Sequence, residues 1–279
     1  MHSYIQNLPQ NDSLIPQFDQ NIRSLTAIKL LCFLTKAVQN HRGATMGYLS
    51  GEPSFLLLAE KQEIAVEKTL RIIKESKFQQ LHYGPVVDVE NICNDWRTVI
   101  AGWKGDQILN NFEFHSHLVH RINTLLRTFM QSSLLPCIDL EDDSNRLLLE
   151  LLLIRIPNAI ENLAKLRGLS TNAAVSKICE TDSRSKISYL LKEIFREHQS
   201  LGQLYEKCTS GNDTISRQEK PLTRFILTIQ LAILDAREIV IDSASVFSLA
   251  TSIINAHWLA IEKGIEQQEK ISYKSLIKL

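Results

Sequence analysis

Apolar side chains recur at helical spacing along most of this chain of 279 residues. In the segment 22–50, for example, Leu31, Leu34, Val38 and Leu49 fall on one side of an α-helix. Glycine and proline number only 10 and 7, which leaves few turns and long elements. No segment alternates apolar and polar residues as a strand does, and the β-branched run at 239–241 is too short. We therefore predict an all-α fold of long antiparallel helices.

The predicted helices are separated by segments rich in glycine, proline and small polar residues. Pro157 is expected to kink or split the helix in which it lies, because proline removes a backbone donor. Residues 1–20 are predicted to be an irregular N-terminal lead-in, 21–270 one all-helical sensor-like domain, and 271–279 a C-terminal tail. The helices are expected at about 22–50, 54–77, 87–103, 111–132, 145–167, 171–179, 184–207, 221–237 and 244–269.

The charges of the chain are balanced. Lysine plus arginine and aspartate plus glutamate both number 31, so the formal net charge is zero. No run of basic residues is present, whereas proteins that bind nucleic acid or anionic membranes usually carry a basic excess or stripe. We therefore expect neither a nucleic-acid partner nor a membrane partner.

The cysteines and the apolar runs indicate a cytoplasmic location. The five cysteines are an odd number, widely spaced and without a CxxC pair, so they indicate core residues in a reducing compartment. The N-terminus lacks the basic start and apolar stretch of a signal peptide. The most apolar run, 147–156, contains Glu150 and Arg155 and is shorter than the roughly 20 residues that a membrane span needs.

Two arginines stand on apolar helix faces. Arg42 follows Val38 by one turn, and Arg167 continues the stripe of Ile160 and Leu163. An unpaired buried guanidinium is costly, so each needs a carboxylate, carbonyl groups or a bound anion. Two arginines facing one pocket could hold a planar anion, because the guanidinium fork matches trigonal oxygens. The alternative is that each is paired with an acid of a neighbouring helix, or extends to solvent from the end of the bundle.

Several segments, in order along the chain, resemble the nitrate- and nitrite-sensing helical domain family (NIT domains), which is related to helical sensor domains of chemotaxis receptors. The first is residues 39–51, QNHRGATMGYLSG, which is similar to the Glu-Arg-Gly motif that ends the first long helix of that family. Residues 114–119, 147–170 and 245–253 resemble its fourth, middle and last helices. The resemblance covers about residues 25–265.

The resemblance implies a non-enzymatic sensor domain with two stacked helical bundles that share long helices. It also implies that arginines from different helices bind the anion, and by motif position these are Arg42 and Arg167. Two positions depart from the family. His41 replaces the usual glutamate, and His257 lies where nitrate-binding relatives supply an arginine. A protonated His257 could take the place of that arginine, although histidine is mostly neutral at pH 7.

Other candidate sites are weaker. His115, His117 and His120 form a cluster, but at about 100° per residue His115 points away from the other two, so no metal site is predicted. The acidic run at 139–143 lacks the spacing of a calcium loop and more simply precedes a helix start. No phosphate-loop, dinucleotide or nucleophile-elbow motif is present, and we predict neither a catalytic residue nor a cofactor.

The sequence thus favours a signal-sensing module that binds a small ligand, such as nitrate, nitrite or another small anion, and passes the signal to a regulatory partner protein. Arg42, Arg167, His41 and His257 are the candidate ligand-binding residues. Self-association into a homodimer is compatible with this hypothesis. The alternative is a helical protein–protein interaction scaffold without a ligand, in which the arginines are structural.

Overall fold

A computed structural model describes residues 14–76, 86–134, 143–209 and 214–277. The described residues are 89% helical and contain no strand, which confirms the all-α prediction. The loops predicted at 83–85 and 210–213, almost all of the acidic run, and Cys137 lie outside the described residues.

Nine α-helices carry the described part of the chain, and most lie close to their predicted bounds. Short 3₁₀ turns occur at Trp103–Gly105 and Ser216–Gln218. Five-residue π-helical segments occur at Met130–Leu134, Leu151–Arg155 and Gln230–Leu234. The α-helices are α1 Leu14–Leu49, α2 Phe55–Glu75, α3 Val86–Ile100, α4 Ile108–Phe129, α5 Asp143–Glu150, α6 Ile156–Ser176, α7 Thr181–Cys208, α8 Glu219–Ile229 and α9 Ser243–Ile277.

Three predicted boundaries are wrong. Helix α1 begins at Leu14, inside the expected lead-in, and α9 continues to Ile277, inside the expected tail. Gly168 does not end a helix but lies within α6. A methyl group at Gly168 would stand 2.6 Å from the sulfur of Met46, so this glycine permits close packing of α6 on α1.

The helix is distorted but not broken next to Pro157. The π-helical segment Leu151–Arg155 ends immediately before α6, and Pro157 occupies the first turn of that helix, where a missing backbone donor costs little. Asp242 caps α9 by accepting a hydrogen bond from the backbone nitrogen of Ser245 at 2.7 Å.

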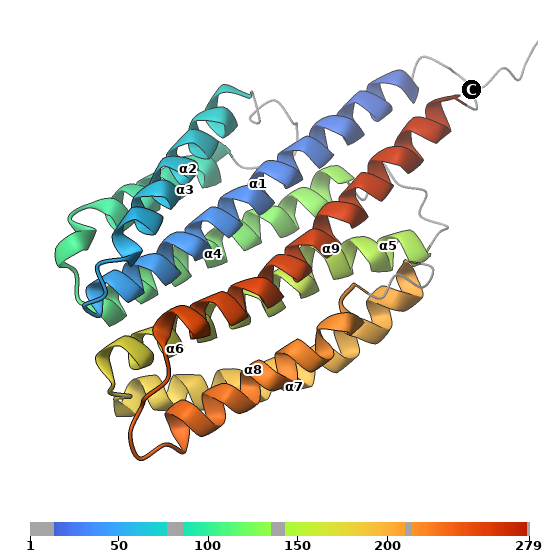
Figure 1. Cartoon of the computed structure of the whole chain (residues 1–279). Coiled ribbons are helices and arrows are strands. Elements are labelled where there is room, and N and C mark those ends of the chain that lie inside the picture. The colour runs from blue at the N-terminus through green and yellow to red at the C-terminus, as the bar shows by residue number, and fades with distance from the viewer. Residues whose placement is uncertain (1–13, 77–85, 135–142, 210–213, 278–279) are drawn as a thin grey trace, which may run out of the picture.

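Helices α1, α4, α6 and α9 make the central layer of the molecule (Figure 1). Helices α2 and α3 pack on α1 and α4, and helices α7 and α8 pack against α6 and α9. Hydrogen bonds and ion pairs between helices set their directions: α1 runs parallel to α6 and antiparallel to α4 and α9, and α7 runs antiparallel to α6. Helices α4 and α7 therefore point the same way.

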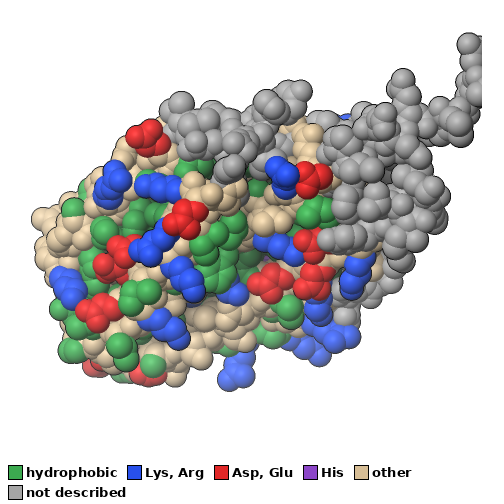
Figure 2. All heavy atoms as spheres, turned by 90° about the horizontal axis from the view of Figure 1, so that it is seen from above, with side chains coloured by type: hydrophobic (Ala, Val, Ile, Leu, Met, Phe, Trp, Pro, Cys, Tyr) green, Lys and Arg blue, Asp and Glu red, His purple; other side chains and the backbone are tan. Residues whose placement is uncertain are grey.

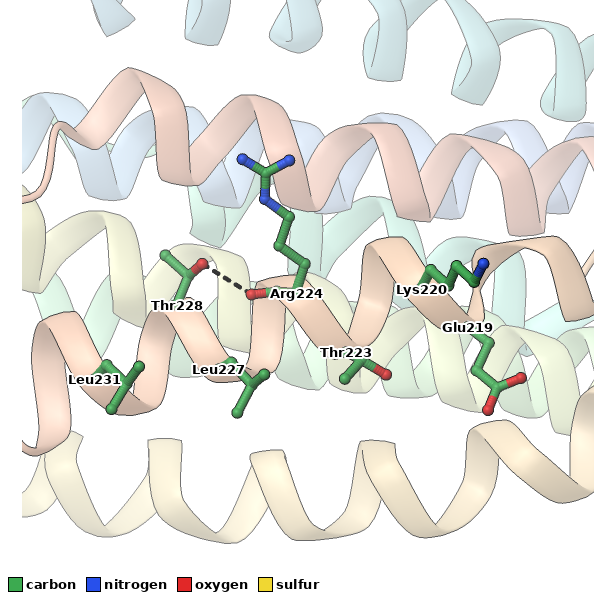
Figure 3. A pocket seen from close by; sticks show the side chains of 7 residues that line it. All are labelled: Glu219, Lys220, Thr223, Arg224, Leu227, Thr228 and Leu231. Atoms are coloured by element: carbon green, nitrogen blue, oxygen red, sulfur yellow. Dashed lines mark hydrogen bonds between the residues drawn. The ribbon is translucent and has the colours of Figure 1, made fainter.

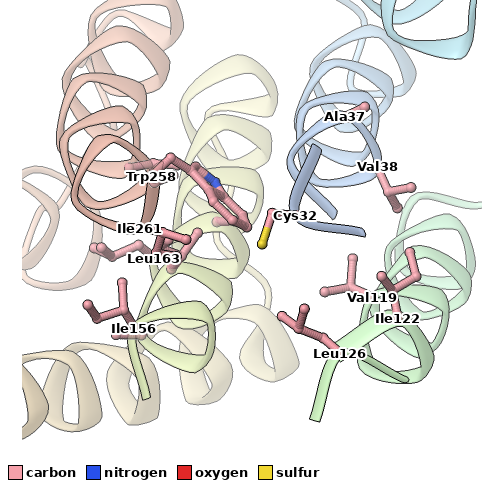
Figure 4. Close-up of a cluster of buried hydrophobic side chains, with 14 of the residues drawn as sticks. Cys32, Ala37, Val38, Val119, Ile122, Leu126, Ile156, Leu163, Trp258 and Ile261 are labelled. Atoms are coloured by element: carbon pink, nitrogen blue, oxygen red, sulfur yellow. The ribbon is translucent and has the colours of Figure 1, made fainter. Parts of the chain in front are cut away.

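The core is apolar where the four central helices meet (Figure 4). Cys32 and Val38 of α1, Ile122 of α4, Ile156 and Trp258 contribute side chains that are at most 7% exposed. Burial also raises the pKa of the Cys32 thiol to about 12, which fits a small core residue rather than a reactive one.

One stretch of α9, Ser243–Ile271, is long and apolar enough to cross a membrane by length and composition alone. The sequence alone had indicated 147–156 as the most apolar run. Within α9, Ala250, Ile253 and Ile261 are fully buried against the rest of the molecule, as in the core helix of a bundle.

Candidate functional site

Arg42 forms a buried ion pair with Glu161. Its guanidinium donates to both carboxylate oxygens of Glu161 on α6, from Nη1 at 2.7 Å and from Nη2 at 3.0 Å. Nη1 also donates to the Ser116 hydroxyl on α4 at 2.9 Å, and the amide of Gln39 donates to Glu161 Oε2 at 2.9 Å. Arg42 is 0% exposed and Glu161 8%. The sequence left open whether Arg42 holds an anion or pairs with an acid of a neighbouring helix. The structure shows the acid, Glu161.

Arg167 is equally buried but has no carboxylate in contact among the described residues. Its Nη1 donates to Asn40 Oδ1 at 3.2 Å and to the Thr251 hydroxyl at 2.9 Å, and its Nη2 donates to the Gln39 carbonyl at 2.8 Å. The guanidinium carbon lies 4.7 Å from the centroid of the Phe247 ring, a cation–π contact. Its Nε has no hydrogen-bond partner in the described structure.

The free edge of Arg167 faces the backbone of α1 at Gly43. A methyl group at Gly43 would stand 3.1 Å from both Nε and Nη2 of Arg167, and 3.0 Å from the Phe247 ring. The guanidinium is thus enclosed between a glycine and an aromatic ring. An additional group can reach its Nε edge only if α1 and α6 move slightly apart.

Glu161 bonds Arg42 and acts on Arg167 only through its charge. Burial, and next the charge of Arg42, lower the pKa of Arg167 to about 9, whereas Glu161 opposes the shift. Lys165 also approaches Glu161, at 3.7 Å from Oε1, with a side chain 33% exposed. The buried part of this network therefore carries two positive charges and one negative charge, which is an unfavourable balance in a low-dielectric core.

His41 points away from both arginines, toward a second buried cluster. Its Nδ1 lies 2.7 Å from Nε2 of His115, whose Nδ1 in turn lies 2.7 Å from the Asn111 carbonyl. This geometry makes His115 a donor through Nδ1 and an acceptor through Nε2, so His41 donates to it. The indole rings of Trp96 and Trp103 meet His41 edge-on at 5.1 and 5.5 Å. Burial lowers the pKa of His41 to about 3, so the cluster is neutral.

His257 is separate from the arginines as well. It lies nearly two helical turns beyond Thr251, its Nδ1 bonds the Ile253 carbonyl at 2.9 Å, and its ring neighbours His198 at 5.7 Å. Burial lowers the pKa of His257 to about 4. His257 is thus a neutral imidazole nearly two helical turns from Thr251, the residue of α9 that bonds Arg167. It does not take the place of the arginine that the resemblance implies at this position.

The histidine cluster of α4 is divided as expected. His115 is fully buried, whereas His117 lies 3.8 Å from Asp95 on the outside of the helix, and His120 lines a polar cleft. Within the described ranges, no three histidine, cysteine or acidic side chains are grouped so that they could hold a metal ion.

The polar cleft opens beside the Arg42–Glu161 pair. It has a volume of about 300 Å³ and lies between α4, α6 and α7. Ser116 and Glu161, which both bond Arg42, form part of its wall, so the buried network borders a solvent-filled space. This cleft was not predicted, because its residues come from three helices that are far apart in the sequence.

The polar partners of the arginines were also missed. Glu161 stands four residues before Lys165, a spacing that suggests an exposed helix pair. One signal could have identified it: the surrounding positions 156–174 are apolar or small on almost every side, as in a helix buried all round.

The arrangement of the site has to be interpreted without relatives. Comparison of the chain with protein-family models, with curated protein sequences and with solved structures finds no match.

Proposed function

We propose that the chain is a non-enzymatic sensing module that binds a small monovalent anion at Arg167, between α1, α6 and α9. One observation carries the proposal: of two fully buried guanidiniums close together, only that of Arg42 bonds a carboxylate, and Arg167 has none in contact among the described residues. A singly charged anion would balance the network. It would also supply the acceptor that Arg167 Nε lacks among the described residues.

The shape of the free edge favours a planar anion. The Nε–Nη2 edge of a guanidinium matches two oxygens of a trigonal anion, which nitrate and nitrite both offer. Both would enter between the Phe247 ring and Gly43. The proposal keeps Arg167 as the direct ligand and Arg42 as its charged neighbour, and it leaves His41 and His257 outside the anion site.

The tight contact at Gly43 supports a way to signal. Because the anion needs space that the contact occupies, binding would favour a state in which α6 and α9 stand slightly farther from α1. We take α1–α4 and α5–α9 as two helical bundles that meet at this network. A change at their junction would then alter their packing, and a partner protein in the cytoplasm would detect it.

Thermal unfolding tests the proposal directly. The full chain is heated in sodium nitrate, nitrite, chloride and sulfate at equal ionic strength, together with Arg167→Gln and the control Arg121→Gln. A ligand at about 100 times its Kd adds roughly 2.7 kcal/mol to stability, which corresponds to several degrees. Arg121 bonds Asp95 outside the network, so its variant should keep the nitrate response, and Arg167→Gln should lose it.

The opposite results are equally clear. If nitrate and nitrite raise the melting temperature no more than chloride, or raise that of Arg167→Gln as much as that of the wild type, the anion proposal fails. Arg167→Gln is expected to fold, since it removes a buried charge that has no acid in contact in the described structure.

A second candidate, the interaction scaffold, has an observation of its own. Leu227 and Leu231 lie on the same side of one helix, are 52% and 64% exposed, and line a hollow of about 560 Å³ (Figure 3). Exposed apolar groups of this kind often mark contact surfaces. Sedimentation velocity of the wild type and of the Leu227→Glu/Leu231→Glu variant tests whether a second copy docks here. Concentration-dependent association that the variant loses supports a scaffold.

A further inference from the structure

The polar cleft between α4, α6 and α7 has a size that suits a small organic molecule. Its volume is about 300 Å³, and both α4 and α7 pack on α6, which forms its floor. The wall side chains are mostly amides, hydroxyls and charged groups, so a bound molecule would be recognised by polar contacts.

Two charged side chains, Arg127 of α4 and Glu197 of α7, line the cleft from different helices, about one helical turn apart in level. Lys186 of α7 bonds Glu113 of α4, and the two residues are 73 positions apart. Because α4 and α7 run in the same direction, the same offset places Glu197 level with Thr124. Arg127, three residues farther, is one helical turn away on the same wall.

These two groups also lack ion-pair partners in the described part of the chain, while the other acids of the cleft have them. Glu161 is held by Arg42, and Glu193 by Arg196. Glu197 accepts only a 3.3 Å hydrogen bond from the amide of Asn162, which leaves its other oxygen free.

A third group marks where a donor is missing. The side-chain oxygen of Asn123 is buried, lines the cleft and has no hydrogen-bond partner in the described structure. A buried acceptor left without a donor costs free energy that a ligand N–H would recover. Burial raises the pKa of Glu197, although the hydrogen bond from Asn162 and the charges of Arg196 and Arg155 oppose the rise.

We infer that this cleft binds a small zwitterion of the α-amino acid class. The ligand ammonium bonds Glu197 and Asn123, and the ligand carboxylate bonds the guanidinium of Arg127 at the rim. This site is separate from the anion site at Arg167 and does not depend on it. It adds a second ligand site. Two residues of its wall, Ser116 and Glu161, also bond Arg42.

Other ligand classes fit the cleft less well. A simple anion would meet Glu161, Glu193 and Glu197 along with the basic groups, and a simple amine would leave Arg127 without a partner. A metal ion would need a cluster of ligands, and the described residues contain none. A zwitterion satisfies the unpaired acid and the unpaired base together.

Isothermal titration calorimetry of the full chain tests the inference. L-serine, L-glutamine and L-leucine are the probes, and acetate and ethylamine are analogues that carry one charge each. We expect at least one amino acid to bind, and Glu197→Gln and Arg127→Gln each to weaken it about tenfold or more, as for a lost charge-assisted hydrogen bond. Arg121→Gln, on the same helix but outside the cleft, is expected to bind as the wild type does.

The inference is overturned if no amino acid binds, if both cleft variants bind like the wild type, or if acetate or ethylamine binds as tightly as the amino acids. Circular dichroism is the control for folding, and we expect both variants to fold because both substitutions are near the surface. The nitrate response of the same proteins separates this result from the anion proposal. Glu197→Gln should keep that response, and Arg167→Gln should keep amino-acid binding.

Discussion

Removing the Glu161 carboxylate is the sharpest test of the buried network. In Glu161→Leu, Arg42 loses both carboxylate hydrogen bonds, and the Gln39 amide loses its acceptor. Arg42 is fully buried, and in this variant the leucine side chain stands between it and the cleft that Glu161 borders. Breaking a buried pair in this way costs about 3–5 kcal/mol, and we expect the free energy of unfolding to fall by that amount. A typical domain has only about 5–15 kcal/mol in total.

A second substitution shows whether the loss comes from the stranded charge. In Arg42→Met/Glu161→Leu the guanidinium is absent, and buried pairs replaced by apolar residues are often close to neutral in stability. The double variant should therefore be about 2 kcal/mol or more above Glu161→Leu. Urea unfolding of the wild type, both single variants and the double variant, followed by circular dichroism, gives the coupling energy. The exposed pair of Lys104 and Glu60 is the control, with a coupling expected below about 1 kcal/mol.

The reasoning is refuted if Glu161→Leu costs no more than the same change at Glu60. It is also refuted if the double variant loses as much stability as the two single variants added together. Either result would mean that the guanidinium finds other acceptors or reaches water, and the charge imbalance of the network would not exist.

Three further predictions concern other parts of the core. Gly43→Ala places a methyl group 3.1 Å from Nε of Arg167, so it should abolish the nitrate-induced rise in melting temperature; an undiminished rise would place the anion elsewhere. His257 has its pKa lowered to about 4, so on unfolding it takes up a proton when the pH is below the ordinary histidine value. This residue alone should lower the free energy of unfolding by about 2 kcal/mol between about pH 7 and about pH 5, in addition to the loss from His41. The pH slope measured by urea unfolding should therefore be smaller in His257→Leu than in the wild type. Gly264→Ala would push a methyl group into a core leucine and should cost about 1–3 kcal/mol in urea unfolding, whereas Gly105→Ala, with nothing within 4 Å, should cost much less.

The burial of the arginines could be predicted from sequence, but their partners could not. The apolar stripes around Arg42 and Arg167 point to the core, and both side chains are 0% exposed. Glu161 belongs to a different helix from Arg42, and the contact between them joins positions 119 apart in the chain. Such a pairing depends on how helices pack, and a helical period fixes only which face is apolar.

Helix boundaries failed where packing overrode local preference. Glycine is typical of helix ends, but Gly168 lies within α6. Its missing side chain leaves room for Met46 of the neighbouring helix. Conversely, a disturbance near Pro157 was expected from the sequence, and it is present as the π-helical segment just before α6, since the effect of a proline is local and follows from its own ring. The polar cleft lay beyond sequence reasoning for the same reason as Glu161: its walls are brought together only by the tertiary fold.

The surface gives little guidance to function on the face shown in Figure 2, where basic, acidic and apolar side chains alternate without a patch of one sign. The interior is therefore the informative part of this molecule. Its two polar features, the arginine network and the cleft beside it, both involve α6, the helix with the most continuous burial.

The π-helical segments have a consequence for how chains of this type can be compared. The segment Leu151–Arg155 holds an extra residue between α5 and α6 of one continuous helix, so the apolar face beyond it is shifted in phase by about 100°. Leu151, Leu152 and Leu153 are all buried, so the segment lies in the core. An alignment that forbids gaps inside helices would lose the correct register at this segment. Related chains are therefore better sought with a single-residue insertion permitted at Leu151–Arg155.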